Sequence, residues 1–431
     1  MRSFLPIPEQ HPFPIQNLPY GIFSTPEKEP RVGVAIGDFV LDLAELEAAN
    51  LLPGSDARSS SETSEVRCSR SGVFARRDLN AFIAQGEDNW REVRAALLYL
   101  LDEQTLALRS NDQLRRRALI PAQEVRLHLP VSIGDYTDFY SSKSHAANVG
   151  RIFRGENTAL LPNWVYLPVA YHGRASSIVL SGTAIRRPCG QIKRATEAEP
   201  HFEASRELDF ELEVGYFIGA ENSLGVPVPI KGADQHLFGM VLVNDWSARD
   251  IQRWEYVPLG PFSAKNFGTS ISPWVVTLAA LGPFRTTAPV QDPAPLSYLR
   301  SDARTAYDIR LEVQLQTASM PAPAVVSRTN FKELYWTIGQ QVAHHTVTGC
   351  NLRIGDLLAS GTISGPGPAT YGSMLELTSG GKEPLRLPNG EKRCFLEDGD
   401  TVIFTGYAQG DNYRVGFGEV RGTILPAYTG G

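Results

Sequence analysis

The sequence predicts a β-rich α+β protein with a small mixed N-terminal domain and a larger, mostly β C-terminal domain. At 431 residues the chain is too long for one ordinary hydrophobic core, so two domains are expected. Its 38 glycines and 30 prolines are spread along the chain and predict frequent turns between many strands. Short runs of alternating apolar and polar residues, typical of half-buried strands, become common after residue 130.

The N-terminal section is predicted to be compact and mixed. Residues 20–43 are expected to form a β-hairpin, because apolar residues alternate before a turn supplied by Gly37 and Asp38. A helix is expected to begin at Asn80, since four apolar side chains then recur on one face: Trp90, Val93, Leu97 and Leu100. The serine-rich stretch 55–72 is expected to be a mobile loop, and no function is assigned to it.

A domain boundary is placed at the short connection that Pro121 and Pro130 bracket. After this connection the chain is rich in strand patterns and glycine-bearing turns up to its closing section, as in 398–406 and 413–420. The predicted division is therefore an N-terminal domain of residues 1–130 and a C-terminal domain of residues 131–431.

The composition indicates a globular protein and argues against two kinds of partner. A formal net charge of −6 and an isoelectric point near 5.8 disfavour nucleic acid and anionic membrane surfaces. The four cysteines lie far apart without a CxxC pair, which predicts reduced thiols in an intracellular protein. The first residues are broken by prolines, unlike a signal peptide, and no apolar stretch reaches the length of a membrane span. A cytoplasmic location is expected.

Four carboxylates are the most informative residues of the chain. Glu211 and Glu213 lie on one face of an alternating segment, 207–217, and successive like charges on a strand face repel unless solvent or a cation compensates them. Asp245 ends an apolar run, and Asp138 lies in a further strand-like segment. Oxygen ligands gathered from separate strands suit Ca²⁺ or Mg²⁺ better than zinc. The alternative is an ordinary acidic, solvated strand face.

A helix is predicted directly after Asp245, with Ser247 as its N-cap. Arg249, Gln252 and Tyr256 would then project from one face and form a substrate cradle beside the carboxylate. The alternative is an amphipathic surface helix with three apolar side chains turned inward: Trp246, Ile251 and Trp254. Downstream, Lys265 stands among small and apolar residues and is a candidate for a buried ammonium that stabilises negative charge. A solvated surface lysine is the alternative.

The remaining candidates are a histidine, a glutamate and a turn. His145 follows Asp138 through a short polar turn and is suited to general-base work, while Tyr140 shares the strand face of Asp138. Glu376 is placed on a strand, from which it would orient the histidine. The glycine-bracketed turn around Thr362 has backbone amides and a hydroxyl that could hold a carboxylate. A structural histidine and a surface glutamate are the alternatives.

Several of these segments together resemble the fumarylacetoacetate hydrolase family. The segments are DYTDFYSS at 135–142, YHGRASS at 171–177, NDWSARDIQ at 244–252, WEYVPLGPF at 254–262 and LASGTISG at 358–365. The resemblance extends over essentially the whole chain, including the N-terminal domain. The serine-rich stretch departs from it, away from every site motif.

The resemblance implies a fold and an activity. The N-terminal domain would be a small SH3-like β-barrel, followed by a larger mixed β-sandwich or β-roll catalytic domain, in a homodimer. The enzyme would hydrolyse the carbon–carbon bond of 4-fumarylacetoacetate, a small diketo-dicarboxylate, to fumarate and acetoacetate. This is the last step of tyrosine and phenylalanine degradation.

The resemblance also implies roles for single residues. A divalent cation, most often Ca²⁺, would be bound by Asp138, Glu211, Glu213 and Asp245. A second ion, Mg²⁺, would be bound by Asp245 together with Lys265 and Thr269. His145 would be the general base with Glu376 as its partner, and the oxyanion would be surrounded by Arg249, Gln252 and Lys265. The substrate would contact Tyr140, Arg154, Gln252, Tyr256 and Thr362.

Two other functions compete with this reading. Another reaction of the superfamily, such as acylpyruvate hydrolysis or oxaloacetate decarboxylation, would keep the metal carboxylates. It would not require the N-terminal domain or the complete trio on the helix face. A non-catalytic, metal-stabilised scaffold would not need both His145 and Glu376.

Overall fold

The N-terminal section is built on an antiparallel sheet in this computed structural model, which describes residues 1–53, 72–301 and 305–428. The sheet order is β4-β3-β2-β1-β5, and its strands are β1 Tyr20–Thr25, β2 Lys28–Ile36, β3 Phe39–Asp42, β4 Leu119–Pro121 and β5 Arg126–His128. The turn at Gly37 and Asp38 joins β2 to β3, which confirms the predicted hairpin. Between described residues, β4 and β5 form the two edges of an open sheet, so the SH3-like closure is not confirmed.

Among the described residues, four helices accompany this sheet: α1 Leu43–Ala48, α3 Asn80–Ile83, α4 Gly86–Leu101 and α5 Asp112–Ala118. The single helix predicted from Asn80 is therefore two, because the chain turns at Gly86, whose φ is +83°. The connection between Pro121 and Pro130 is not a free linker, since β5 pairs with β1 inside the sheet. The division at residue 130 stays a prediction, and the serine-rich stretch lies outside the described residues apart from Gly72.

The rest of the chain is organised around an eight-stranded sheet. Its order is β7-β6-β22-β13-β14-β16-β8, with β17 paired to β14. The strands are β6 Tyr136–Phe139, β7 Ala170–Gly173, β8 Ile178–Leu180, β13 Leu212–Ile218, β14 Leu237–Asp245, β16 Thr269–Ile271, β17 Val276–Thr277 and β22 Leu357–Ala359. Every residue of β13 and β14 is buried, so both faces of these strands are covered.

A second sheet of five strands packs against one face of the first. Its order is β21-β20-β25-β26-β9, with β9 Ile185–Arg186, β20 Arg310–Gln316, β21 Ala324–Asn330, β25 Thr401–Gln409 and β26 Arg414–Leu425. Met240 and Leu242 of β14 belong to the core shared with this sheet, whereas Val241 and Val243 belong to the core shared with the N-terminal section. The strand alternation thus distributes β14 between two cores.

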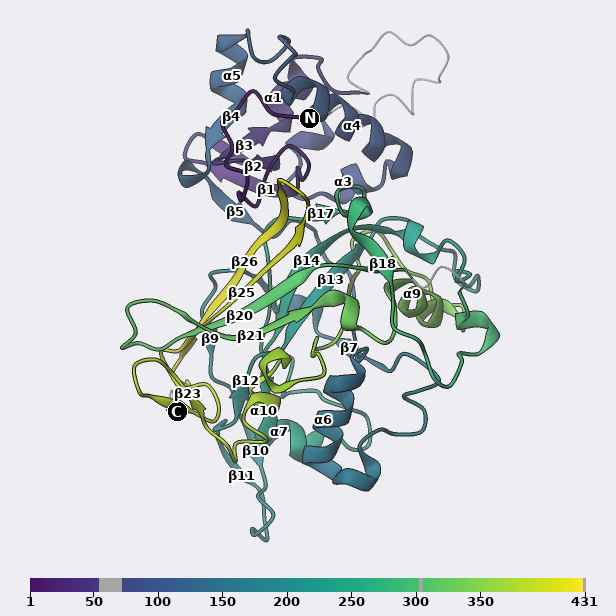
Figure 1. The fold of residues 1–431 in the computed structure, drawn as a ribbon, viewed down its shortest axis with the longest axis vertical. Helices are drawn as coiled ribbons and strands as arrows, with labels where there is room; N and C mark the ends of the chain where they lie inside the picture. Colours follow the sequence, from purple (N-terminus) through teal and green to yellow (C-terminus); the bar gives the residue numbers. More distant parts are fainter. Residues whose placement is uncertain (54–71, 302–304, 429–431) are drawn as a thin grey trace.

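Short paired strands and helices complete the fold. The strands are β10 Cys189–Ile192, β11 His201–Ala204, β12 Leu208–Asp209, β15 Ser247–Ala248, β18 Arg285–Thr287, β19 Thr305–Tyr307, β23 Leu385–Arg386 and β24 Lys392–Arg393. The helices are α6 Lys143–Arg154, α7 Arg249–Glu255, α8 Leu278–Leu281, α9 Ile338–Thr346 and α10 Met374–Leu377. Figure 1 shows α6, α7 and α10 gathered at the end of the molecule away from the N-terminal section. No described helix is long and apolar enough to cross a membrane.

The contact between the N-terminal section and β14 should dominate the stability of the chain. The Phe238 ring lies 5.9 Å from Tyr20, 6.0 Å from Phe82 and 5.0 Å from Trp90. Phe238→Ala should lower the free energy of unfolding by about 3–5 kcal/mol, because it empties a packed core. Denaturant titration measures the change. Phe202→Ala is the control, since Phe202 is 77% exposed and its loss should cost at most about 0.5 kcal/mol.

Candidate active site

The four predicted carboxylates meet at one point in the central sheet. Asp138 comes from β6, Glu213 from β13 and Asp245 from the end of β14, and Glu211 stands just before β13. Each offers an oxygen, and the four oxygens all lie within 4.8 Å of one another. The side chains are buried, so the alternative of a solvated acidic face is wrong. It fails because the side chains of Lys265, Arg249 and Tyr171, which are distant in sequence, contact Glu211 and Asp245.

Asp138 and Glu213 are the poorly compensated members of this acidic cluster. Among the described residues, neither oxygen of Glu213 has a hydrogen-bond partner. Burial, together with the charges of Asp138 and Asp245, raises the pKa of Glu213 well above its ordinary value. Burial and the charge of Asp245 do the same to the pKa of Asp138. A buried carboxylate without partners fits a hard divalent cation, for which these oxygen donors are the ordinary ligands.

Glu211 and Asp245 are instead paired with basic side chains. Lys265 Nζ contacts Glu211 and lies 2.8 Å from Asp245 Oδ2, and Arg249 Nη2 lies 2.7 Å from Glu211 Oε1. Although burial opposes the change, Lys265 and Arg249 lower the pKa of Glu211 below its ordinary range. Burial likewise opposes, but Asp245 and Glu211 outweigh it, and the pKa of Lys265 is raised. Lys265 is therefore a buried ammonium that donates hydrogen bonds, and direct ligation of Mg²⁺ by it stays a prediction.

Asp245 is held by two further hydroxyl groups. Tyr171 OH donates to Asp245 Oδ2 at 2.6 Å, and Thr269 Oγ1 donates to Asp245 Oδ1 at 3.0 Å. A cavity of about 180 Å³ opens beside them and is lined by Tyr171, Asp245, Lys265 and Thr269 among others. Sequence reasoning used Tyr171 only as part of a motif. Its place one strand away from Asp138, in the β6–β7 pairing Asp138↔Tyr171, is visible only in the sheet.

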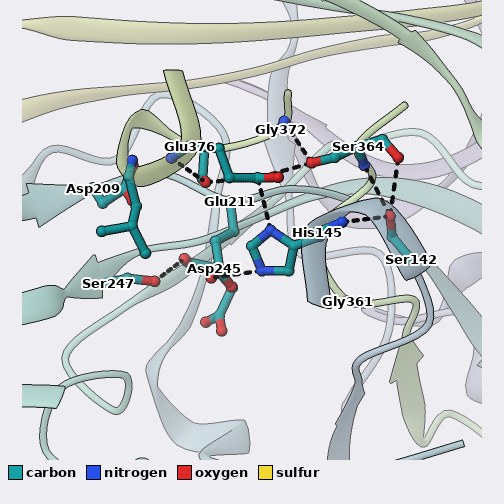
Figure 2. Close-up of polar contacts among 12 residues, drawn as sticks. Ser142, His145, Asp209, Glu211, Asp245, Ser247, Gly361, Ser364, Gly372 and Glu376 are labelled. Carbon is teal, nitrogen blue, oxygen red and sulfur yellow. Dashed lines mark hydrogen bonds and ion pairs between the residues drawn. The ribbon is translucent and has the colours of Figure 1, made fainter. Parts of the chain in front are cut away.

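His145 and Glu376 meet although 231 residues separate them. His145 Nδ1 lies 2.7 Å from Glu376 Oε2, and both side chains are buried (Figure 2). Ser142 caps α6 and accepts a hydrogen bond from the His145 amide at 3.2 Å, which fixes the helix start. Glu376 was predicted to lie on a strand, but it lies on the short helix α10. The apolar alternation around it is too short to distinguish one helical turn from a strand.

Glu376 is ionised and fully engaged. Its oxygens accept hydrogen bonds from three further side chains: Asn148 Nδ2 at 2.9 Å, Ser364 Oγ at 2.8 Å and Ser373 Oγ at 2.8 Å. Burial opposes ionisation, but His145 and these donors lower the pKa of Glu376 below its ordinary value. The carboxylate therefore accepts the Nδ1 proton of His145, which leaves Nε2 as the basic atom. Nε2 faces the acidic cluster, 3.9 Å from Glu211 Oε1.

The helix after Asp245 begins one residue later than predicted. Ser247 is not its N-cap, because the Ser247 hydroxyl donates to the Asp245 carbonyl at 3.0 Å and Ala248 occupies the cap position. Trp254 is 42% exposed and not turned inward. Arg249 and Gln252 do share a face, with Arg249 Nη1 donating to Gln252 Oε1 at 3.0 Å. Arg249 is only 1% exposed, so α7 is not an ordinary surface helix.

Of the other predicted substrate residues, Tyr140 contacts His145, and Tyr256 contacts α6, the helix that carries His145. The Tyr140 ring lies 5.3 Å from the His145 ring. Tyr256 follows α7, and its ring lies 6.3 Å from Phe153 of α6, the helix that also carries Arg154. Burial and the charge of Glu376 raise the pKa of Tyr140, while Arg154 and Arg249 oppose the change.

The turn around Thr362 contacts the carboxylate of Asp138, and its predicted contact with the substrate stays a prediction. The Gly361 amide donates to Asp138 Oδ1 at 3.1 Å. Gly361 has a φ of +74°, and a Cβ there would lie 2.1 Å from the Phe139 carbonyl oxygen, so only glycine fits. The buried Thr362 hydroxyl has no hydrogen-bond partner among the described residues, which leaves it available to a ligand.

Comparison with known proteins gives these features a context. Residues 136–425 match the family model described as fumarylacetoacetate (FAA) hydrolase C-terminal, and residues 16–130 match fumarylacetoacetase N-terminal. The chain is 53% identical over 426 residues to the fumarylacetoacetase of Homo sapiens, covering 99% of both chains. It is 51% identical to that of Arabidopsis thaliana over 429 residues, with 99% of each covered. A solved fumarylacetoacetate hydrolase of the psychrophile Exiguobacterium antarcticum is 16% identical, with a TM-score of 0.52, and covers 95% and 99% of the two chains.

The curled β-rich fold, the buried acidic cluster and the paired histidine and glutamate define an enzyme of the hydrolase class whose carboxylates could hold a metal ion. The chain belongs to the fumarylacetoacetate hydrolase family. The alternative of a non-catalytic scaffold is therefore wrong.

Glu211 and Glu213 should respond oppositely to removal of their charge. In protein treated with a chelator, Glu211→Gln should lower the free energy of unfolding by about 3–5 kcal/mol, because Lys265 and Arg249 lose a buried partner. Glu213→Gln should raise it, since burial and the charges of Asp138 and Asp245 outweigh the attraction of Lys265 at Glu213. Both variants should lose bound divalent ion. Denaturant titration and elemental analysis measure these changes, and unaltered metal content in both variants would end the metal-site interpretation.

The advantage of Glu213→Gln should grow with pH. The pKa of Glu213 is raised in the folded chain, so the folded state binds its proton more tightly than the unfolded state does. Its contribution to stability is therefore lost as pH rises above the unfolded value of about 4.3. Melting temperatures of wild type and Glu213→Gln are measured in chelator from acid to neutral pH. The melting temperature of Glu213→Gln should exceed that of wild type by a margin that grows as pH rises. Parallel curves would contradict the raised pKa.

Proposed function

We propose that this enzyme hydrolyses the carbon–carbon bond of 4-fumarylacetoacetate and releases fumarate and acetoacetate, the last step of tyrosine and phenylalanine degradation. The observation that carries the proposal is the contact of His145 with Glu376 beside the acidic cluster, in a chain 53% identical to a fumarylacetoacetase over nearly its full length. The substrate is a small diketo-dicarboxylate. We assign residues 1–130 to an N-terminal SH3-like domain and residues 131–431 to the catalytic domain.

His145 is the general base of the proposed reaction. His145 donates its Nδ1–H to Glu376, so Nε2 is free to take a proton from water. The oxygen of that water attacks the carbonyl beside the fumaryl double bond. The carbon–carbon bond then breaks, its electron pair remains on the acetoacetate carbon, and that carbon is protonated. The balance is one water consumed, with one carboxylate and one C–H bond formed. The pair is 2% and 3% exposed, which keeps bulk water from competing for the base.

The cations of the site stabilise the negative charge that develops. Arg249 and Lys265, with Gln252 beside Arg249, are assigned to the oxyanion, and a lost donor of this kind typically costs about 3–4 kcal/mol. Asp138, Glu211, Glu213 and Asp245 would hold Ca²⁺, and Asp245 with Lys265 and Thr269 would hold Mg²⁺. Such a cation would supply Lewis-acid stabilisation of the diketone oxygens and the leaving fragment. Tyr140, Arg154, Tyr256 and Thr362 are assigned to substrate binding.

We further propose a homodimer in the cytoplasm. Three apolar side chains beside the site are strongly exposed in the single chain: Val257 at 68%, Leu259 at 94% and Phe262 at 73%. Because Phe262 also lines the cavity next to Asp245, a second copy covering this segment would close the site on that side. The free thiols of Cys189, Cys350 and Cys394 support a reducing compartment.

Turnover of 4-fumarylacetoacetate, followed by the loss of its diketone absorbance, tests the activity directly. The wild-type protein should consume it and form fumarate and acetoacetate in equal amounts. His145→Ala should lower kcat by roughly 10²–10⁴-fold, the usual contribution of general acid–base catalysis. Glu376→Gln should lower it less and shift the pH–rate profile, because it orients the same imidazole.

Two outcomes would contradict the proposal. A wild-type protein that leaves fumarylacetoacetate intact but cleaves an acylpyruvate would move the activity to another reaction of the superfamily. Near-normal turnover by a folded His145→Ala protein would remove His145 from the role of base. Circular dichroism of the variants is the control for folding.

A further inference from the structure

Asp209 is a fully buried carboxylate for which the proposed function has no role. It is 0% exposed and ends β12, where it pairs with Ser247 of β15. Its two oxygens accept four hydrogen bonds, from the Phe210, Met374 and Leu375 amides and from Arg249 Nε. Four donors on one carboxylate, drawn from the next residue in the chain and from two separate helices, α10 and α7, are more than a single helix cap or ion pair requires.

Two of these hydrogen bonds hold the start of α10. The Met374 amide donates to Asp209 Oδ1 at 2.6 Å, and the Leu375 amide donates to Oδ2 at 3.0 Å. Amides at the first turn of a helix have no partner within the helix, and a helix of four residues is not stable by itself. The position of α10, and with it the position of Glu376 against His145, therefore depends on contacts from outside the helix.

The same carboxylate holds Arg249 from the opposite side. Arg249 Nε donates to Asp209 Oδ2 at 2.8 Å, while the other end of the guanidinium lies against Glu211. Arg249 and the α10 amide of Leu375 thus share one oxygen atom of Asp209. A guanidinium gripped at Nε presents its Nη atoms in a fixed direction, because the group is planar.

We infer that Asp209 is a positioning residue that sets the oxyanion donor Arg249 and the base-orienting Glu376 relative to each other. It does not touch the substrate and acts only through these two residues. The inference rests on the proposed function for the roles of Arg249 and Glu376. The contacts that join them through Asp209 do not depend on it.

Asp209→Asn tests the inference through kinetics. Asn keeps the size of the side chain but replaces one acceptor oxygen with an NH₂ group that faces N–H donors. We expect kcat and kcat/KM to fall together by roughly 10–100-fold, as for other residues that orient site groups, while KM stays nearly unchanged. Asp250→Asn is the matched control. Asp250 is 6% exposed and accepts from Ser205 Oγ and the Arg206 and Ile251 amides, so it is equally buried but contacts neither α10 nor the Arg249 guanidinium.

Hydrogen–deuterium exchange of the segment 373–378 supplies a readout that needs no activity. Exchange there should be faster in Asp209→Asn than in wild type and unchanged in Asp250→Asn. The inference is overturned if the 373–378 amides exchange at the wild-type rate in Asp209→Asn. It is also overturned if the wild type is active and Asp209→Asn and Asp250→Asn lower kcat by the same factor. A wild type without turnover of fumarylacetoacetate would remove the proposed function, and exchange alone would then decide the role of Asp209.

Discussion

The burial of four carboxylates around one point is the constraint on which the rest of the site depends. In a low-dielectric interior, like charges within 4.8 Å repel strongly, so each must be paired, protonated or bound to a cation. The chain treats the four differently. Glu211 and Asp245 form ion pairs with Lys265 and Arg249, and Asp138 accepts one hydrogen bond from the Gly361 amide. No described residue donates a hydrogen bond to Glu213. Asp138 and Glu213 are thus left without an ion-pair partner among the described residues, and two such carboxylates suit a hard divalent ion.

The same compensation places the reactive groups. Glu211 contacts both cations and lies 3.9 Å from His145 Nε2, so the base, the oxyanion donors and the acidic cluster meet at one side chain. Glu376, on the far side of the imidazole, is surrounded by donors and stays ionised. The two glutamates near His145 therefore have different work. Glu376 accepts the hydrogen bond of Nδ1 and fixes the tautomer of the ring, and Glu211 lies between the ring and the rest of the acidic cluster.

The sequence predicted which residues form the site better than how the chain delivers them. Carboxylate alternation located Glu211 and Glu213, because a strand period of two is visible in eleven residues. Their burial was not predictable, since Arg249 and Lys265, which contact Glu211, and Asp138, which lies beside Glu213, are distant in sequence. Glu376 was assigned to a strand because one helical turn is too short to show its period. Asp209 lies in the same alternating segment, but its contact with α10 spans 165 residues and was not predicted. Ser247 resembled a helix cap, but the β12–β15 pairing holds it in a strand and moves the cap position to Ala248.

The strand β14 connects the N-terminal section to the acidic cluster, although that section contributes no residue to the cluster. Phe238, near one end of β14, packs against aromatic rings of that section, and Asp245, at the other end, lies in the acidic cluster. The strand is buried along its whole length and hydrogen-bonded on both sides, so it moves as one piece. Substitutions that inactivate the protein should therefore not cluster only around the acidic cluster. A substitution that loosens the N-terminal core should also displace Asp245 at the far end of β14, and a compound that fills that core could restore the position of Asp245 from a distance.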